Sequence, residues 1–238
     1  AMSIIHSISI MGDSILRGVV LNNNTKKYSI SNTINMDSIA QMYSIEVTNL
    51  SRFGCTVDRG YEYVSRFLQK GNRTDALMLE LGGNDSDFNW AEIATNPDAE
   101  HSPKTPLDKF TEIYRNIIKL LRDHKILPVI TTLPPVCPER YLDWVCRDGL
   151  DRDAILHWLG GSPNTIYRYQ ENYSRAIEGL AAESGSVCVD LRGAFLANRR
   201  IDGLYCEDGI HPNEAGQLII RKTLISTLEK HKGAIVPC

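Results

Sequence analysis

Residues 75–83 read DALMLELGG, and this stretch indicates the fold more strongly than any other part of the chain. It is almost continuously apolar from Ala76 to Leu81. A strand with one face in water alternates apolar and polar residues, whereas a strand covered on both faces is apolar throughout, as in parallel sheets. The stretch therefore predicts a buried strand in the middle of a parallel sheet.

Four further strand patterns surround this stretch, and helical patterns separate them. The strand patterns lie at residues 4–11, 45–51, 125–135 and 185–191, and helices are predicted at 57–69, 165–182 and 214–230. Another helix is predicted to begin at "TPLD", with Thr105 as its N-cap and Pro106 as its first residue. This alternation predicts a three-layer α/β/α sandwich around a central, mostly parallel five-stranded sheet.

The 238 residues predict one domain, 1–238. Two connections, at about 86–104 and 134–163, are long for a compact domain and are interpreted as loop insertions that bind ligands or cover a site.

Composition and charge argue against several classes of function. A formal net charge of -3 gives neither the basic surface that binds nucleic acid nor a polybasic patch for anionic membranes. No apolar run reaches the roughly 18 to 20 residues of a membrane span. We therefore expect a small-molecule partner, no nucleic-acid partner and no stable membrane association. The oligomeric state is not predicted.

The N-terminal residues enter the first strand pattern without the pattern of a secretory signal, so we expect a cytoplasmic protein whose six cysteines are thiols. The cysteines form no CxxC, which argues against a zinc site, and we expect no metal. Cys137 and Cys146 are close enough in sequence to pair in an oxidising compartment, and this alternative stays open.

Polar turns follow the predicted strands, and ligands bind at the carboxyl ends of the strands in parallel sheets. The first turn is Gly-Asp-Ser at residues 12–14, after which apolar residues follow at helical spacing (Ile15, Leu16 and Val19). Ser14 has two interpretations. It is either the N-cap of a helix or a nucleophile beside free backbone N–H groups that bind an oxyanion. A serine nucleophile needs a base within hydrogen-bond reach.

Among six histidines, His211 is the best candidate for that base, because it stands in a polar turn, "EDGIHPNEAG", at the start of the last predicted helix. Asp208 precedes it by three residues, and a turn over that interval brings a carboxylate to the second imidazole nitrogen. The alternative is that Asp208 caps a turn and His211 is a surface residue.

Two more turns supply candidate donors to an oxyanion. Asn84, in "GGND" after the 75–83 strand, offers a side-chain amide, and Gly54, in "SRFGCT", offers a backbone amide. Each is, by itself, also a common turn residue. Together the four turns supply a nucleophile, a base with its acid, and oxyanion donors, which is the set that acyl transfer needs.

These motifs resemble those of the SGNH hydrolases, also called the GDSL lipase and esterase family. "GDS" resembles the first block, the glycine of "FGC" the second, "GGND" the third and "DGIH" the last, in the same order from Met11 to Asn213. One departure is Ile15, where the family name expects leucine.

The resemblance implies a flavodoxin-like hydrolase fold and a serine hydrolase that cleaves acyl esters without a cofactor. It implies that Ser14 is the nucleophile, His211 the base and Asp208 its orienting acid, with an oxyanion hole made by the Ser14 amide, the Gly54 amide and the Asn84 side chain. Asp13 and Asp85 belong to the same motifs and are expected to brace turns.

Other classes of function stay open. A metal-dependent phosphoesterase is disfavoured because "GGND" has no histidine after it and the chain has no His-x-His. A non-catalytic binding module on the same fold would be expected to lack a catalytic residue, and none is missing.

The substrate is expected to be a small-acyl or carbohydrate ester, and a lysophospholipase or thioesterase is the alternative. All three tryptophans fall in the two long connections. Together with Phe88 and Tyr141 in the same connections, they are predicted to wall a substrate pocket, with Trp90 and Trp144 as the substrate-binding candidates. The alternative is an apolar cluster beneath the loops.

Overall fold

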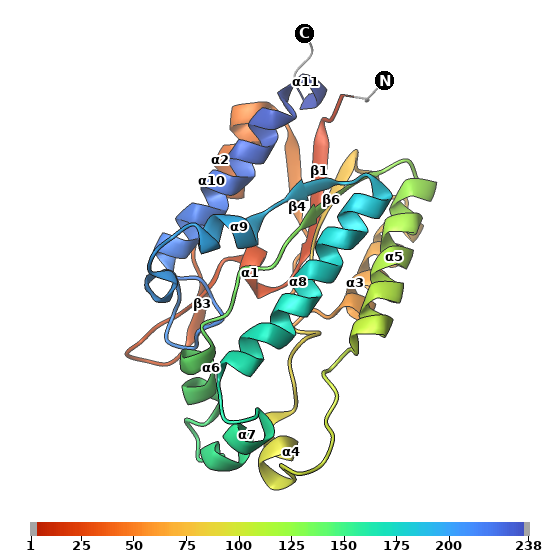
Figure 1. Ribbon diagram of the computed structural model, residues 1–238. Coiled ribbons are helices and arrows are strands. Elements are labelled where there is room, and N and C mark those ends of the chain that lie inside the picture. The colour runs from red at the N-terminus through yellow and green to blue at the C-terminus, as the bar shows by residue number, and fades with distance from the viewer. Residues whose placement is uncertain (1–3, 236–238) are drawn as a thin grey trace.

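The computed structural model describes residues 4–235 and has a five-stranded, all-parallel sheet at its centre (Figure 1). The strand order is β4-β1-β5-β6-β7, so the 75–83 pattern forms a strand in the middle of the sheet, as predicted. The strands are β1 (Ser7–Gly12), β4 (Glu46–Asn49), β5 (Ala76–Glu80), β6 (Leu127–Thr131) and β7 (Val187–Val189).

Helices cover both faces of the sheet and confirm the three-layer sandwich (Figure 1). One face carries α3 (Val57–Gln69), α5 (Leu107–Asp123) and α8 (Asn164–Ser184). The other carries α2 (Met36–Tyr43), α9 (Leu191–Leu196) and α10 (Glu214–Lys230), which α11 (Lys232–Ile235) follows. Leu77 and Leu79 of β5 pack into the first layer and Ala76 and Met78 into the second, which explains the continuous apolar run.

The segment after Ser14 differs from the predicted helix, because a short helical turn is followed by a small hairpin. The helix α1 (Ser14–Arg17) lasts one turn, because Gly18 adopts the left-handed conformation with φ 82° and its backbone N–H donates to the carbonyls of Ile15 and Ser14. The prediction that the helix extends to Val19 is therefore wrong. Val19 begins β2 (Val19–Leu21), which pairs in antiparallel fashion with β3 (Tyr28–Ile30).

The two long connections carry short helices that lie beyond the carboxyl ends of the strands (Figure 1). Their buried apolar side chains form a cluster separate from the two layers of the sandwich. The first connection contains α4 (Trp90–Thr95) and the second contains α6 (Pro138–Val145) and α7 (Arg152–Trp158). A short 3-10 helix, η1 (Ile201–Leu204), lies before the last polar turn. The loops thus carry helices that the sequence patterns did not indicate.

The predicted N-cap of α5 is wrong in detail. The helix begins at Leu107, and Pro106 occupies the cap position without a side-chain hydrogen bond. The Thr105 hydroxyl donates instead to Asp85 Oδ1 at 2.6 Å, so Thr105 ties the long connection to the "GGND" turn.

The cysteines at 55, 137, 146, 188 and 206 are free thiols in the structure, so Cys137 and Cys146 are not paired in it. Between residues 4 and 235, no helix has the length and the apolar character needed to cross a membrane.

Candidate active site

Ser14 stands at the carboxyl end of β1, as the first residue of α1. The N-cap is its neighbour Asp13, whose Oδ1 accepts a hydrogen bond from the Ile15 backbone N–H at 2.9 Å. The interpretation of Ser14 as the cap is therefore wrong. Its hydroxyl points to the imidazole of His211, with Oγ 2.8 Å from Nε2 across 197 positions of sequence. The expected role of Asp13 as a brace of this turn is confirmed.

The Asp208–His211 turn holds the imidazole on the side opposite Ser14. Asp208 Oδ2 lies 2.6 Å from His211 Nδ1, and Oδ1 accepts hydrogen bonds from the backbone N–H groups of Ile210 and His211 at 3.1 and 3.0 Å. Because a carboxylate only accepts hydrogen bonds, Nδ1 carries the proton and Nε2 is free to accept from Ser14. Both side chains are buried.

Gly209 makes this turn possible. Its φ of 74° lies in the left-handed region, and a Cβ there would stand 2.6 Å from the Cys137 carbonyl oxygen and 2.8 Å from the Tyr141 backbone nitrogen. Only glycine fits both the backbone conformation and the close approach of α6. Asn213 then caps α10 by accepting from the Gly216 N–H at 3.0 Å, which fixes the other end of the turn.

The electrostatics keep Asp208 charged. Burial alone would raise its pKa, but hydrogen bonds from the His211 imidazole and backbone, together with the charge of that imidazole, hold the pKa below its ordinary value. Tyr28 adds a further hydrogen bond, its hydroxyl donating to Asp208 Oδ2 at 2.8 Å. An ionised carboxylate therefore faces the imidazole at neutral pH.

The predicted oxyanion donors line the same cleft as Ser14 and His211. Gly54 lies in the loop after β4 with φ 71°, and its position has open space around it. The Asn84 amide nitrogen donates to Asp13 Oδ2 at 3.1 Å and to the Cys55 carbonyl at 3.2 Å. These two bonds orient the Asn84 amide between the β1 corner and the Gly54 loop.

Buried carboxyl groups brace the floor of the site. Glu80, at the end of β5, accepts a hydrogen bond from the Leu16 N–H at 3.2 Å, and burial beside Asp13 raises its pKa well above the usual range. Asp85 accepts from the Val57 N–H at the start of α3, at 3.0 Å, and burial raises its pKa to about 6. The expected bracing role of Asp85 is confirmed.

A cleft of about 210 Å³ opens beside Ser14. Its wall away from the hairpin is largely apolar and aromatic, with Phe88, Trp90, Tyr141, Ile166 and Tyr169. Asp87 organises part of this wall, because its Oδ1 accepts from Tyr141 Oη at 2.7 Å and from Trp90 Nε1 at 3.0 Å.

The two tryptophans predicted to bind substrate lie in different places. Trp90 belongs both to the cleft wall and to the apolar cluster of the long loops. Trp144 does not line the cleft. It lies beyond Tyr28, with ring centroids 6.4 Å apart, in a neighbouring groove where the Arg147 guanidinium stands 3.9 Å over its ring.

Sequence reasoning did not find Tyr28, Asp87 or Gln170 as cleft residues, whereas Phe88 and Tyr141, expected in the pocket wall with the tryptophans, do line the cleft. Tyr28 sits in a hairpin whose β3 strand is entirely exposed, and Gln170 lies within a helix, so neither pattern signals a site. The "NDSD" run, which contains Asp87, was the available signal.

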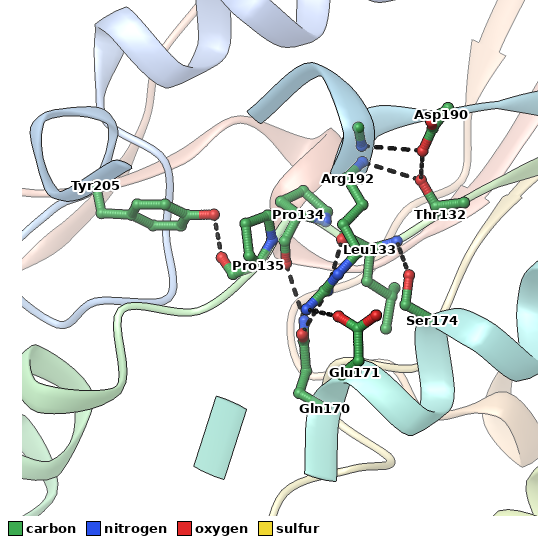
Figure 2. Close-up of polar contacts among 11 residues, drawn as sticks. Thr132, Leu133, Pro134, Pro135, Gln170, Glu171, Ser174, Asp190, Arg192 and Tyr205 are labelled. Carbon is green, nitrogen blue, oxygen red and sulfur yellow. Dashed lines mark hydrogen bonds and ion pairs between the residues drawn. The ribbon is translucent and has the colours of Figure 1, made fainter. Parts of the chain in front are cut away.

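Figure 2 shows a buried polar network that supports the cleft from behind. Arg192, 3% exposed, donates through Nη1 to Gln170 Oε1 at 2.7 Å and to the Leu133 carbonyl at 3.1 Å, and its Nη2 lies 2.6 Å from Glu171 Oε2. Gln170 donates in turn to the Pro134 carbonyl at 2.9 Å. Leu133, Pro134 and Gln170 line the cleft, so Arg192 fixes part of its wall.

Within the part of the chain that the structure describes, no three His, Cys, Asp or Glu side chains are grouped so as to hold a metal ion. The cleft presents a hydroxyl, an imidazole and amide donors, and the Asp208 carboxylate contacts the far nitrogen of that imidazole.

Solved structures share this fold. A lipase/acylhydrolase from Enterococcus faecalis has a TM-score of 0.65 at 18% identity, over 98% of each chain. An acetylxylan esterase from Geobacillus stearothermophilus has a TM-score of 0.63 at 17% identity, over 95% of each chain. A psychrotrophic esterase from Pseudoalteromonas has a TM-score of 0.60 at 14% identity, covering 95% of this chain and 98% of the other.

Comparison with curated protein sequences gives no match. The model of the GDSL-like lipase/acylhydrolase family matches residues 10–219, which spans all four motifs. The sequence resemblance is thereby confirmed. The chain belongs to the GDSL-like lipase/acylhydrolase family and is a carboxylic ester hydrolase.

Proposed function

We propose that the chain hydrolyses small acyl esters through a catalytic triad of Ser14, His211 and Asp208. The observation that carries the proposal is the unbroken line of short contacts in the cleft, from Ser14 Oγ to His211 Nε2 at 2.8 Å and from His211 Nδ1 to Asp208 Oδ2 at 2.6 Å. This is the arrangement by which a weak hydroxyl nucleophile is activated.

In the proposed reaction, Ser14 Oγ attacks the ester carbonyl carbon and His211 Nε2 takes the hydroxyl proton. Asp208 stabilises the imidazolium that forms and keeps its ring in place. When the tetrahedral intermediate collapses, the C–O bond to the alcohol breaks and the alcohol leaves with the proton from Nε2. A water molecule, activated by His211 in the same way, then cleaves the acyl–Ser14 ester and regenerates the hydroxyl.

The oxyanion is proposed to be bound by the backbone N–H groups of Ser14 and Gly54 and by the Asn84 amide. Asn84 already lies between Asp13 and the Gly54 loop. We infer that one N–H of this amide turns to the oxyanion, while the other keeps the amide in place. Such preorganised donors supply much of the rate enhancement in acyl transfer.

The acyl group is proposed to lie against the aromatic wall around Trp90. We expect this group to be small because the cleft is small. The cleft volume of about 210 Å³ is below the roughly 300–1,000 Å³ of sites that hold drug-sized ligands. A carbohydrate alcohol portion is proposed to extend past Tyr28 toward Trp144, which lies in the next groove. Acetylxylan esterases of the same fold make this combination of a short acyl group and a sugar our first choice.

A longer acyl chain is the second candidate, of the lysophospholipase or thioesterase type. Its support is the apolar character of the wall formed by Phe88, Val136, Ile166 and Ile210, which would accept an alkyl chain. For either substrate, the nucleophile, the base and the acid of the proposed triad are all side chains of this chain, so the reaction requires no cofactor. We also propose that the whole chain acts as one hydrolase domain, because residues of both long loops line the same cleft.

The test is hydrolysis of p-nitrophenyl acetate, butyrate, octanoate and palmitate by the wild type, by Ser14→Ala and by His211→Gln. We expect wild-type activity to peak at acetate or butyrate and to fall by at least about 10⁴-fold in Ser14→Ala. A peak at octanoate or palmitate would favour the second candidate. Undiminished activity in Ser14→Ala would refute the triad.

A further inference from the structure

Tyr28 reaches the triad from a part of the chain that carries none of the family motifs. It lies on β3, where all three residues are exposed, and 38% of its own surface is exposed. Its hydroxyl nevertheless donates to Asp208 Oδ2 at 2.8 Å, and its ring lies 5.1 Å from the His211 ring between centroids. A surface hairpin therefore contacts both the acid and the base of the proposed triad.

With Tyr28, the Asp208 carboxylate has four hydrogen bonds. Oδ1 accepts from two backbone N–H groups, while Oδ2 accepts from His211 Nδ1 and from the Tyr28 hydroxyl. A carboxylate offers about four acceptor positions. The phenol therefore completes the set and leaves the carboxylate no freedom to rotate away from the imidazole.

The hairpin is tied to the segment that carries Asp208. The Leu21 N–H points to Cys206 Sγ at 3.4 Å, and Lys26 forms an ion pair with Glu207. The Tyr28 ring also packs edge-on against Phe53, with centroids 5.9 Å apart, and lies near Trp144. These contacts hold the phenol in one place over the Asp208–His211 pair, although the strand itself is exposed.

We propose that Tyr28 is a positioning residue for ester hydrolysis, whose phenol O–H shares Asp208 Oδ2 with the imidazole and fixes the carboxylate toward His211. This inference rests on the proposed function. It has a second consequence, because a donor on Oδ2 withdraws part of the negative charge that the imidazole meets. Burial and the charge of Asp208 raise the pKa of Tyr28, so the phenol keeps its proton at neutral pH.

Other ionisable groups also face the pair. Asp13 lies near the imidazole from the end of β1, and Tyr141 lies near Asp208 from α6. Cys206 lies near Asp208 on the same segment, and Arg147, after α6, faces Tyr28. All four are unchanged when the Tyr28 hydroxyl alone is removed, so a comparison of pH profiles isolates that hydroxyl.

The experiment is Tyr28→Phe, with kcat and KM measured across pH on the best p-nitrophenyl ester. We expect kcat to fall by roughly tenfold, the loss of a hydrogen bond to a charged group, with little change in KM. We expect the acid limb of kcat/KM to move upward by roughly half a pH unit, because Asp208 then presents more charge to the imidazole. Tyr43→Phe is the matched control, since it removes a part-buried tyrosine–carboxylate hydrogen bond, to Glu229, far from the site.

A second measurement separates this proposal from the proposed function. The pKa of His211 is measured by NMR in Ser14→Ala, with and without Tyr28→Phe, which requires no activity. A higher pKa in the double variant supports the positioning role even if Ser14 proves not to be the nucleophile. An unchanged acid limb and an unchanged His211 pKa would overturn it, as would a tenfold loss that Tyr28→Phe still causes in an Asp208→Asn background.

Discussion

Replacing Arg192 by methionine tests whether the buried network behind the cleft supports both stability and substrate binding. Methionine keeps an unbranched side chain of similar reach but removes the guanidinium. Two buried acceptors, Gln170 Oε1 and the Leu133 carbonyl, then lose their donor, and Glu171 loses its cation. The Pro134 segment and Gln170, which line the cleft, lose their common support.

The magnitude follows from those contacts. Each buried acceptor left without a donor costs about 1–3 kcal/mol. Glu171 is 34% exposed, so water hydrates its charge and its loss adds little. We therefore expect the free energy of unfolding to fall by about 2–6 kcal/mol, from the two buried acceptors that lose their donor. For a chain of this size, Tm should fall by roughly 10 °C.

The assay is urea unfolding followed by circular dichroism, with ester hydrolysis measured on the same samples. Arg115→Met is the matched control, because its ion pair with Glu183 at 2.7 Å is exposed on both sides and should hardly affect stability. We expect an unchanged m-value and a raised KM only in Arg192→Met. Equal stability of the two variants would refute the assignment of Arg192 as a support of the cleft.

Three further predictions concern the same site. Burial raises the pKa of Asp85 from 3.8 to about 6, so this carboxyl should lower wild-type stability by about 3 kcal/mol as pH rises through that window; Asp85→Asn should remove that part of the slope in unfolding titrations at pH 4–7. Gly209→Ala should place a Cβ against α6 and cost about 3 kcal/mol or more in the same assay, with at least tenfold lower kcat. Trp90→Ala should shift the ester chain-length profile, and an unchanged profile would exclude Trp90 from the acyl wall.

The central sheet was predictable because its strands are buried on both faces. Leu77 and Leu79 face one layer of helices while Ala76 and Met78 face the other, so the burial itself leaves a continuous apolar signal. The helix at 57–69 was predicted with its correct bounds, because its one buried face leaves apolar residues at helical spacing. The hairpin of β2 and β3 gives no such signal, since its contacts are to side chains far away in sequence.

The polar contacts of the site were predictable in part. Asp208 and His211 lie in one turn, so their contact follows from local sequence, whereas the approach of Ser14 depends on the parallel sheet that brings the strand ends together. Tyr28 and Arg192 contact their partners through tertiary packing alone. The position of Trp144 outside the cleft likewise depends on how α6 packs, which spacing along the chain does not encode.

The most direct measurement of the central claim is covalent labelling of the wild type with a fluorophosphonate, located by peptide mass spectrometry. The account predicts a single adduct on Ser14, formed in step with loss of ester hydrolysis, absent in Ser14→Ala and greatly slowed in His211→Gln. Full loss of activity with the adduct on another residue, or hydrolysis that persists after Ser14 is labelled, would contradict it.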